Sequence, residues 1–373
     1  MRIALVHDSL TAWGGAERVL QSLIDIFPEA DLFTSLADPK VIEKLHFKSS
    51  LVYSELSRCP WAIKHTSWTK PYFYHYYWRR LDLDAYDLVI SSSHSFCANW
   101  VKVKNYHISY IHTPPRFLYQ GVNQLAWLKR VPWAWLAAPY LNYLRHLDCQ
   151  HVSRIDLLLA NSNYVQKRIQ KTYQGQARVL YPPLADWTNG QKTSKNNFKQ
   201  LPKNYYLFFS RLSKQKGTKL LIDTFNQLQK PLVVVGQGRQ MKQMKKLAKA
   251  NIHFVGFVPD DQLFDLVNQA QALIYPAIEE DLGLVPLEVL RVGKPVIAYR
   301  SGGPLETLND QCTVWFDDYQ ASALIQAIKT FEKRLLEGDF SPSICRQQVN
   351  NWPGKHFKKE LLQLVRQHVK SSI

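Results

Sequence analysis

Hydrophobic residues in this chain gather in short runs that are separated by stretches with helical spacing. Residues 2–7 form an apolar run that ends at a polar residue, and residues 16–27 then repeat apolar positions every three or four residues. Runs that are apolar throughout predict strands buried on both faces, and the periodic stretches predict helices between them. The same pattern of a buried strand with a polar tip recurs at 86–93, 107–112, 156–162 and 178–183.

A break in this alternation divides the chain. Residues 184–204 are polar, rich in Asn, Lys and Thr, and without periodicity, which is typical of a linker between domains. The alternation then begins again, with strands expected at 205–210, 231–236, 252–257, 272–277 and 295–299 and helices near 217–229, 239–250, 260–270 and 286–292. The fold class predicted from this pattern is α/β, with two doubly wound parallel-sheet domains.

The domain boundaries follow from the linker and from the length of 373 residues, which suits two domains. We expect the first domain at residues 1–185, the linker at 186–203 and the second domain at 204–353. In parallel sheets of this kind, ligands bind beyond the carboxyl ends of the strands. The residues that matter for function should therefore lie directly after strands.

Charge and cysteine content narrow the choice of partner and compartment. The net charge of +17 indicates an anionic partner, which leaves nucleic acid, a phosphate-bearing ligand and an anionic membrane surface open. The five cysteines are widely spaced, which argues against a disulfide framework or a zinc site. The longest apolar run, 131–141, is too short for a bilayer span of about 20 residues. We expect a cytoplasmic protein that associates with a membrane surface.

Glycines and cations stand at the positions where such sheets bind phosphate. Gly14 and Gly15 follow the first strand and precede a helix, where backbone amides can approach an anion; a simple turn is the alternative. Arg211 and Lys216 follow the strand at 205–210 and could clamp a diphosphate, or could belong to a solvated basic loop. Gly236 lies in a GxG stretch that lacks the third glycine of a dinucleotide fingerprint, so a turn near a bound nucleotide is the favoured interpretation.

The stretch 279–290 places two glutamates on either side of a Gly-Leu-Val-Pro turn. Glu280 follows a strand, and Glu288 is expected about two residues inside a helix whose first turn contains Pro286. Carboxylates accept hydrogen bonds from hydroxyl groups, so these two would bind sugars rather than phosphate. An anion site between them would be formed by the amides of Leu282, Gly283, Leu284 and Val285. The arrangement suits a nucleotide sugar, although Glu288 could instead be an acid favoured by the helix dipole.

Several motifs together resemble the retaining glycosyltransferases of family 4. They are the E-x7-E pair at 280–288, SRLSKQKG at 210–217, GGAE at 14–17 and SGGPLET at 301–307. The resemblance implies the GT-B architecture, in which two Rossmann-like domains face a cleft and a final helix, here 354–373, packs back on the first domain. The amino-acid sequences of residues 279–308 and 110–119 resemble those of a bacterial branch of the family, the O-antigen and exopolysaccharide mannosyltransferases that use GDP-mannose.

The resemblance also implies roles for single residues. Arg211 and Lys216 would hold the donor diphosphate, Glu280 would contact the donor sugar and Glu288 the ribose. His112, at the tip of the strand 107–112, would lie beside the reacting sugar; a buried, hydrogen-bonded histidine is the alternative. Gly15 would approach the phosphate or the acceptor. The sequence departs from the family pattern at Asp281 and Val285, where glycine and proline are frequent. Fixed cations would replace a metal ion, so we expect a metal-independent reaction. The resemblance further implies that the reaction retains the donor's anomeric configuration.

Two segments of the first domain combine aromatic and basic residues. Residues 61–80 contain eight aromatic residues, four lysines or arginines and no acid, and residues 126–146 are similar. Such a composition suits the interface of an anionic membrane, so we predict docking on the inner face of the cytoplasmic membrane, where a lipid-linked acceptor would lie. A buried core or an oligomer interface is the alternative.

We therefore predict a glycosyltransferase that moves mannose from GDP-mannose to a lipid-linked or saccharide acceptor in the synthesis of a cell-surface polysaccharide, with no further cofactor. A UDP-sugar donor remains an alternative. Basic and aromatic residues also suit single-stranded nucleic acid, but no recognisable nucleic-acid-binding module is present, so we expect no such partner. An NAD-linked oxidoreductase is disfavoured by the incomplete glycine pattern, and a non-catalytic nucleotide binder by the presence of the full clamp and both glutamates.

Overall fold

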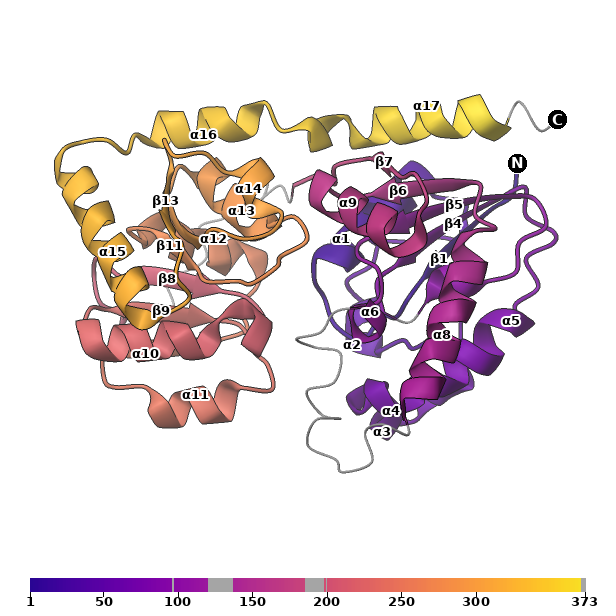
Figure 1. The fold of residues 1–373 in the computed structure, drawn as a ribbon, viewed down its shortest axis with the longest axis horizontal. Coiled ribbons are helices and arrows are strands. Elements are labelled where there is room, and N and C mark those ends of the chain that lie inside the picture. The colour runs from indigo at the N-terminus through magenta and orange to yellow at the C-terminus, as the bar shows by residue number, and fades with distance from the viewer. Residues whose placement is uncertain (96, 120–136, 185–197, 199, 370–373) are drawn as a thin grey trace. The chain divides into compact units, whose positions relative to one another are not determined.

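The structure is a computed structural model that describes residues 1–95, 97–119, 137–184, 198 and 200–369. The chain divides into two compact units. Unit 1 consists of Met1–Pro183 and Pro353–Ile373, and unit 2 of Leu184–Trp352. Each unit is built on one parallel sheet (Figure 1). Among the described residues, no helix is both long enough and apolar enough to cross a membrane.

The sheet of unit 1 has seven strands in the order β3-β2-β1-β4-β5-β6-β7, and every pairing in it is parallel. Its strands are β1 (Ile3–His7), β2 (Asp31–Thr34), β3 (Leu51–Tyr53), β4 (Leu88–Ser93), β5 (Tyr106–Ile111), β6 (Leu157–Ala160) and β7 (Arg178–Val179). Successive side chains of a strand point to opposite faces. Leu5 therefore contributes to the core on one face, and Ala4 and Val6 contribute to the core on the other.

Helices cover both faces of this sheet. They are α1 (Gly15–Ile26), α2 (Pro39–Ile42), η1 (Glu55–Arg58), α3 (Pro60–Lys64), α4 (Thr66–Tyr72), η2 (Phe73–Tyr77), α5 (Trp78–Arg80), η3 (Ala98–Trp100), α6 (Arg116–Tyr119), α8 (Ala137–Val152), α9 (Asn163–Tyr173), η8 (Pro353–His356) and α17 (Phe357–Val369). Helices α1 and α17 share a core with Leu5. On the opposite face, the buried Trp78 of α5 and Trp100 of η3 share a core with residues of η2 and α8.

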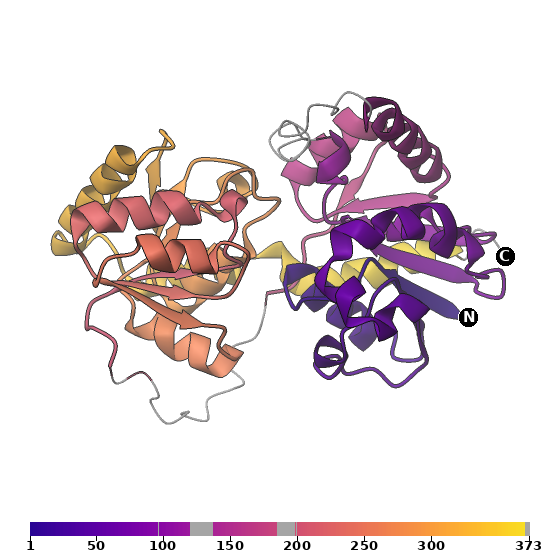
Figure 2. The same cartoon turned by 90° about the horizontal axis from the view of Figure 1, so that it is seen from below.

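The last helix, α17, belongs to unit 1 although it follows unit 2 in the chain. Phe357, Leu361, Leu364 and Val365 are buried in the same core as Leu5. Their spacing of three or four residues places them on one face of the helix, which is the face that packs on the sheet. Figures 1 and 2 show this helix, drawn in yellow, running along unit 1.

Unit 2 has a six-stranded parallel sheet in the order β10-β9-β8-β11-β12-β13. Its strands are β8 (Tyr206–Phe209), β9 (Leu232–Val235), β10 (Ile252–Gly256), β11 (Leu273–Tyr275), β12 (Val296–Tyr299) and β13 (Thr313–Phe316). Its helices are η7 (Lys214–Lys216), α10 (Thr218–Leu228), α11 (Met241–Leu247), α12 (Asp260–Gln269), α13 (Leu284–Val292), α14 (Pro304–Thr307), α15 (Ala321–Leu336) and α16 (Pro342–Asn350). Figure 1 shows α10 and α11 on one side of this sheet and α13 and α16 on the other. Two parallel sheets covered by helices confirm the predicted α/β fold.

One buried carboxylate ties the helices of unit 1 together. Asp148, on α8, is 0% exposed and accepts hydrogen bonds from Trp100 Nε1 at 2.7 Å, Tyr119 Oη at 2.9 Å and Tyr173 Oη at 2.8 Å. Burial raises the pKa of Asp148 to about 6, although these three hydrogen bonds lower it. The side chain therefore joins α8 to η3, α6 and α9, and its ionisation in the folded state costs free energy.

This carboxylate predicts a specific pH dependence of stability. The raised pKa means that the folded chain holds the proton of Asp148 more tightly than the unfolded chain does, so its contribution to stability is lost as pH rises from about 4 to about 6. Asp148→Asn removes this loss of stability, because the asparagine side chain does not ionise. Denaturant unfolding should show that the variant gains stability relative to the wild type by about 3 kcal/mol between about pH 4 and pH 7.

Asp31→Asn is the matched control. Asp31 accepts hydrogen bonds from Ser49, Ser50 and Tyr86, and these hydrogen bonds lower its pKa to about 2. Its contribution to stability is present above its unfolded pKa and is lost only as pH falls through about 4 to 2. The Asp31→Asn difference should therefore stay constant from about pH 5 upward. An Asp148→Asn difference that is equally constant would contradict the assignment.

Candidate functional site

A basic loop and an acidic loop meet at the carboxyl edge of the sheet in unit 2. Arg211 follows β8 and is exposed, and no ion pair joins it to another described residue. Lys216, at the end of η7, forms an ion pair with Glu280, which lies in the loop after β11. The two side chains are 22% and 17% exposed. The amide of Ile278 donates to the carbonyl of Gln215 at 2.9 Å, so the backbone holds these two loops together.

A buried tyrosine lies beneath the acidic loop. Tyr275, the last residue of β11, is 3% exposed. Burial raises the pKa of its phenol, and the charge of Glu280 together with a hydrogen bond to that carboxylate raises it further. The carboxylates of Asp281 and Glu288 raise the same pKa. The charges of both glutamates of the E-x7-E pair therefore act on the same phenol.

The turn between the two glutamates opens helix α13. Gly283 is the N-cap in the left-handed conformation, with φ +85°, and the helix begins at Leu284. The expected start near Pro286 is wrong by two residues, because a left-handed glycine at position 283 lets the chain enter the helix earlier. Glu288 is consequently the fifth helical residue rather than about the second, and it is 5% exposed.

The amides expected at an anion site stand at this helix start. Gly283, Leu284 and Val285 all lie at or before the second helical residue, where amides have no partner within the helix. Pro286 follows and has no N–H group. Leu282 is buried, with 3% exposure. The N-terminus of α13 thus presents its positive dipole end next to the Glu280 loop.

Close backbone contacts fix both loops. A Cβ atom on Gly303 would lie 2.4 Å from the carbonyl oxygen of Asp281, and the Gly303 amide donates to the carbonyl of Glu280 at 2.7 Å. Gly236 directly follows β9 and has φ +119°, and a Cβ atom there would lie 2.1 Å from the carbonyl oxygen of Ser210. Gly236 therefore supports the loop that carries Arg211.

His112 is part of a chain of polar side chains in unit 1. It follows β5, and its Nε2 lies 2.9 Å from Ser92 Oγ. The same hydroxyl lies 3.0 Å from Nδ1 of His7, at the end of β1. Nε2 of His7 is 3.7 Å from Oε1 of Glu17, on α1. His7 and Ser92 are almost completely buried, and His112 and Glu17 are 9% and 7% exposed.

The surroundings of His112 favour its neutral form. Burial lowers the pKa of His112 well below its usual value, and the neighbouring rings of His94 and His7 lower it further. The His94 ring is 6.1 Å from the His112 ring. Asp8 binds the segment that carries His94, accepting from the amides of His94 and Ala98 at 2.8 Å each. A neutral imidazole can accept or donate one hydrogen bond at each ring nitrogen.

The structure thus collects the site residues predicted from the sequence into two groups. Unit 1 contains His112 and Gly15, which is exposed as the first residue of α1. Unit 2 contains the other predicted site residues, which are Arg211, Lys216, Gly236, Glu280, Leu282, Gly283, Leu284, Val285 and Glu288. His7, Ser92 and Glu17 were missed. A usable signal was present, because His7, Ser92 and His112 lie at or next to the ends of three strands. They have the same side-chain parity as the buried Leu5, Ile90 and Tyr110. Within the described residues, no group of three or more His, Cys, Asp or Glu side chains could hold a metal ion.

Comparison with known proteins identifies similar sequences. Residues 190–337 match the family described as "Glycosyl transferases group 1". The alpha-1,3/1,6-mannosyltransferase ALG2 of Kluyveromyces lactis is 24% identical over 313 residues, which cover 67% of this chain and 60% of that protein. Human ALG2 is 22% identical over 281 residues, covering 66% of this chain and 65% of that protein. The match therefore spans less than two thirds of the length of these relatives.

Solved structures share the fold at low sequence identity. Anabaena HepE in complex with UDP and glucose aligns with a TM-score of 0.70 and 18% identity over 98% of this chain and 99% of its own. Sucrose-phosphate synthase from Thermosynechococcus elongatus aligns with a TM-score of 0.72 and 18% identity over 100% of both chains. Likeness at this identity shows a common GT-B fold.

The Gly236 contact predicts a large effect of one added methyl group. Gly236→Ala should lower the midpoint of thermal unfolding because the new Cβ atom cannot fit against Ser210. Gly256→Ala is the matched control, since Gly256 also has positive φ, at +86°, but nothing lies within 4 Å of its added Cβ. Both variants carry backbone strain of about 1–3 kcal/mol, and only Gly236→Ala adds the clash. Equal midpoints would show that this contact does not constrain the loop.

Proposed function

We propose that this chain, which carries a group 1 glycosyltransferase domain and has the GT-B fold, transfers mannose from a nucleotide donor to a glycan acceptor. The observation that carries the proposal is the contact between Lys216 and Glu280 at the start of α13, inside the region that matches the family. Homology to the ALG2 proteins, which are named as alpha-1,3/1,6-mannosyltransferases, supports mannose as the sugar. We propose GDP-mannose as the donor, with no further cofactor and no metal ion.

The charged groups of unit 2 suit the parts of such a donor. The diphosphate would bind the exposed Arg211 and the ammonium of Lys216, which would stabilise the negative charge that develops on the leaving group. In the structure Lys216 forms an ion pair with Glu280. Donor binding would exchange that contact for contacts to phosphate, and the freed carboxylate of Glu280 would accept hydrogen bonds from the sugar. Glu288, with its acid group near Tyr275, would bind the ribose.

The reaction proposed for this site retains the anomeric configuration of the donor. A neutral His112 would bind a hydroxyl of the transferred sugar. The acceptor would be a lipid-linked or saccharide acceptor in the assembly of a cell-surface polysaccharide.

Donor use tests this proposal. Purified full-length chain should hydrolyse or transfer from GDP-mannose in preference to UDP-glucose and UDP-N-acetylglucosamine. Lys216→Ala and Glu280→Ala should each lower turnover by about 100-fold or more, the scale of losing one preorganised electrostatic contact. The control is Lys214→Ala, an exposed lysine two positions away, which should keep near-normal turnover. Preference for a UDP-sugar would overturn the donor, and near-normal turnover of Lys216→Ala would overturn the site.

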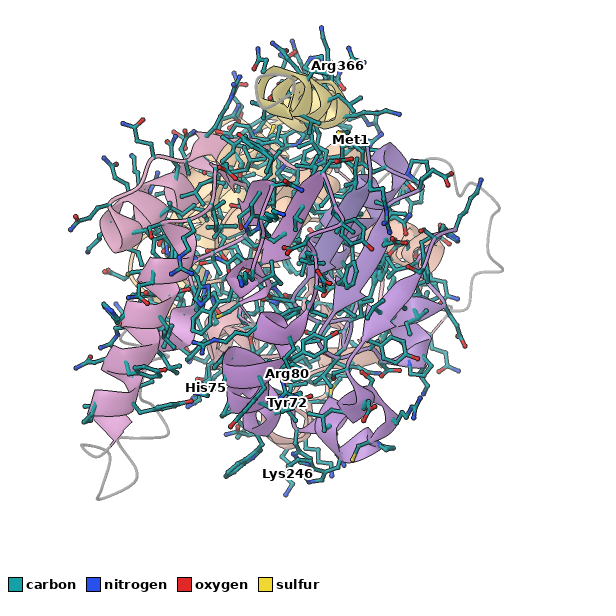
Figure 3. All side chains as sticks on the ribbon, turned by 90° about the vertical axis from the view of Figure 1, so that its right-hand side faces the viewer. Met1, Tyr72, His75, Arg80, Lys246 and Arg366 are labelled. Atoms are coloured by element: carbon teal, nitrogen blue, oxygen red, sulfur yellow. The ribbon has the colours of Figure 1, made fainter. Side chains whose placement is uncertain are left out.

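One end of unit 1 exposes aromatic and basic side chains together. Figure 3 shows Tyr72, His75 and Arg80 at one end of the unit and Arg366 of α17 at the opposite end. The exposed aromatic residues on α3, α4, η2 and α8 are Trp61 at 55%, Trp68 at 77%, Tyr72 at 42%, Tyr76 at 55%, Tyr140 at 40% and Tyr143 at 47%. We call these six residues the aromatic surface. Other aromatic residues of the segment 61–80, such as Trp78, are buried in the core, and residues 126–136 of the second segment lie outside the described residues.

We propose that the aromatic surface docks on an anionic membrane. Trp and Tyr are favoured at the membrane interface, and basic residues beside them favour anionic lipid. Arg79 and Arg80 are exposed on α5, and the Arg80 guanidinium lies 5.9 Å from the centre of the Tyr76 ring. The proposed location is the inner face of the cytoplasmic membrane, where a lipid-linked acceptor would be within reach.

Vesicle flotation tests the docking surface. The full-length chain should float with vesicles that contain anionic phosphatidylglycerol at low salt, and Trp61→Ser combined with Trp68→Ser should reduce the bound fraction several-fold. Leu336→Ser is the control, because Leu336 is 91% exposed but lies on α15 of unit 2. Equal losses for both variants, or a wild-type chain that stays unbound, would contradict docking through the aromatic surface.

A further inference from the structure

We infer that Glu17 sets the tautomer of His112 through His7 and Ser92, so that His112 presents an unprotonated Nδ1 to its ligand. Glu17, His7 and Ser92 are then positioning residues that act on the ligand only through His112. The identity of that ligand, a sugar hydroxyl, rests on the proposed function, but the tautomer itself does not. The contacts that carry the inference all lie within unit 1.

The first step is the common face of three strands. His7 is paired with Ser92 in the register between β1 and β4. The side chains of His7, Ser92 and His112 share the parity of residues that pack beneath α1, so all three point to the face that α1 covers. Glu17 is buried on the inner side of α1. The four polar groups therefore form one connected line under a single helix.

The second step follows the hydrogen atoms along this line. Glu17 is ionised: burial raises its pKa, but the interactions with the neighbouring His7 and His94 lower it by more. A carboxylate oxygen 3.7 Å from Nε2 of His7 favours a hydrogen on that nitrogen, and the inference is that the ring carries this hydrogen alone. Nδ1 of His7 is then an acceptor, so the Ser92 hydroxyl must donate its one hydrogen to it at 3.0 Å.

The third step fixes His112. Because the Ser92 hydroxyl has given its hydrogen to His7, its oxygen can only accept from His112, and Nε2 of His112 at 2.9 Å must carry the hydrogen. A neutral imidazole has one hydrogen, so Nδ1 of His112 has none. No hydrogen bond joins this Nδ1 to another described residue. It is left as an acceptor for a hydroxyl group, and phosphate oxygens, which have no hydrogen, are excluded as its partner.

The matched comparison lies one position back in the same strand. Ser91 Oγ is 2.9 Å from Nε2 of His107, so β4 also carries a second buried Ser–His pair, which points to the other face. No carboxylate contributes to the pKa of His107, which burial alone lowers to about 3. Ser91→Ala removes a buried Ser–His hydrogen bond from the same strand without touching the line that ends at His112.

The experiment reads the tautomer directly. In full-length chain with 15N-labelled histidine at about pH 8, above the ordinary pKa of histidine, long-range 1H–15N spectra distinguish the two tautomers. His112, assigned by comparison with His112→Gln, should have the hydrogen on Nε2. Ser92→Ala and Glu17→Gln should each shift His112 toward the Nδ1-protonated form, Ser92→Thr should keep the wild-type form, and Ser91→Ala should leave it unchanged.

The outcomes separate this inference from the proposed function. A wild-type His112 with its hydrogen on Nδ1, or a tautomer unmoved by both Ser92→Ala and Glu17→Gln, would overturn the inference. If the tautomers respond as expected while the chain uses no nucleotide sugar, the proposed function fails, but the inference that Glu17 sets the tautomer of His112 stands. If both hold, Ser92→Ala should lower kcat roughly tenfold with little change in KM, the size of one lost hydrogen bond.

Discussion

The ion pair between Lys216 and Glu280 is the interaction on which the account of unit 2 depends. It joins a cation that follows one strand to an acid that follows a neighbouring strand, at the edge where parallel sheets bind ligands. Both side chains are partly exposed, so the pair contributes little to stability. Its value lies in position, because it holds together the cation proposed to bind phosphate and the carboxylate proposed to bind sugar hydroxyls.

At the strand ends of unit 1, His112 and Ser92 form a hydrogen-bonded pair, whereas unit 2 has an ion pair. His112 is kept uncharged by burial and by neighbouring histidines, and its orientation comes from Ser92. Both arrangements arise from the same feature of the fold, which places polar residues at the ends of adjacent parallel strands. The buried carboxylate of Asp148 has a structural role instead. It joins helices through hydrogen bonds, and its burial raises its pKa.

Much of the fold could be predicted from the sequence, because buried parallel strands give continuous apolar runs and the polar break near residue 184 separates two series of them. The contact between Lys216 and Glu280 was not predictable, since it depends on which strands are neighbours: β8 lies beside β11, although β9 and β10 come between them in the chain. The start of α13 was misplaced because nothing in the local sequence states that Gly283 adopts a positive φ. His7 and Glu17 were missed because each looks like an ordinary residue until the strands are aligned.

The most direct measurement is calorimetric binding of GDP and of GDP-mannose to the same full-length variants. If Lys216 holds the diphosphate and Glu280 the sugar, Lys216→Ala weakens both ligands. Glu280→Ala then weakens GDP-mannose but leaves GDP binding unchanged or stronger, because the lysine is no longer neutralised. If Glu280→Ala weakens GDP as much as GDP-mannose, or if Lys216→Ala affects neither, the two residues do not divide the donor between them and the account of this site is wrong.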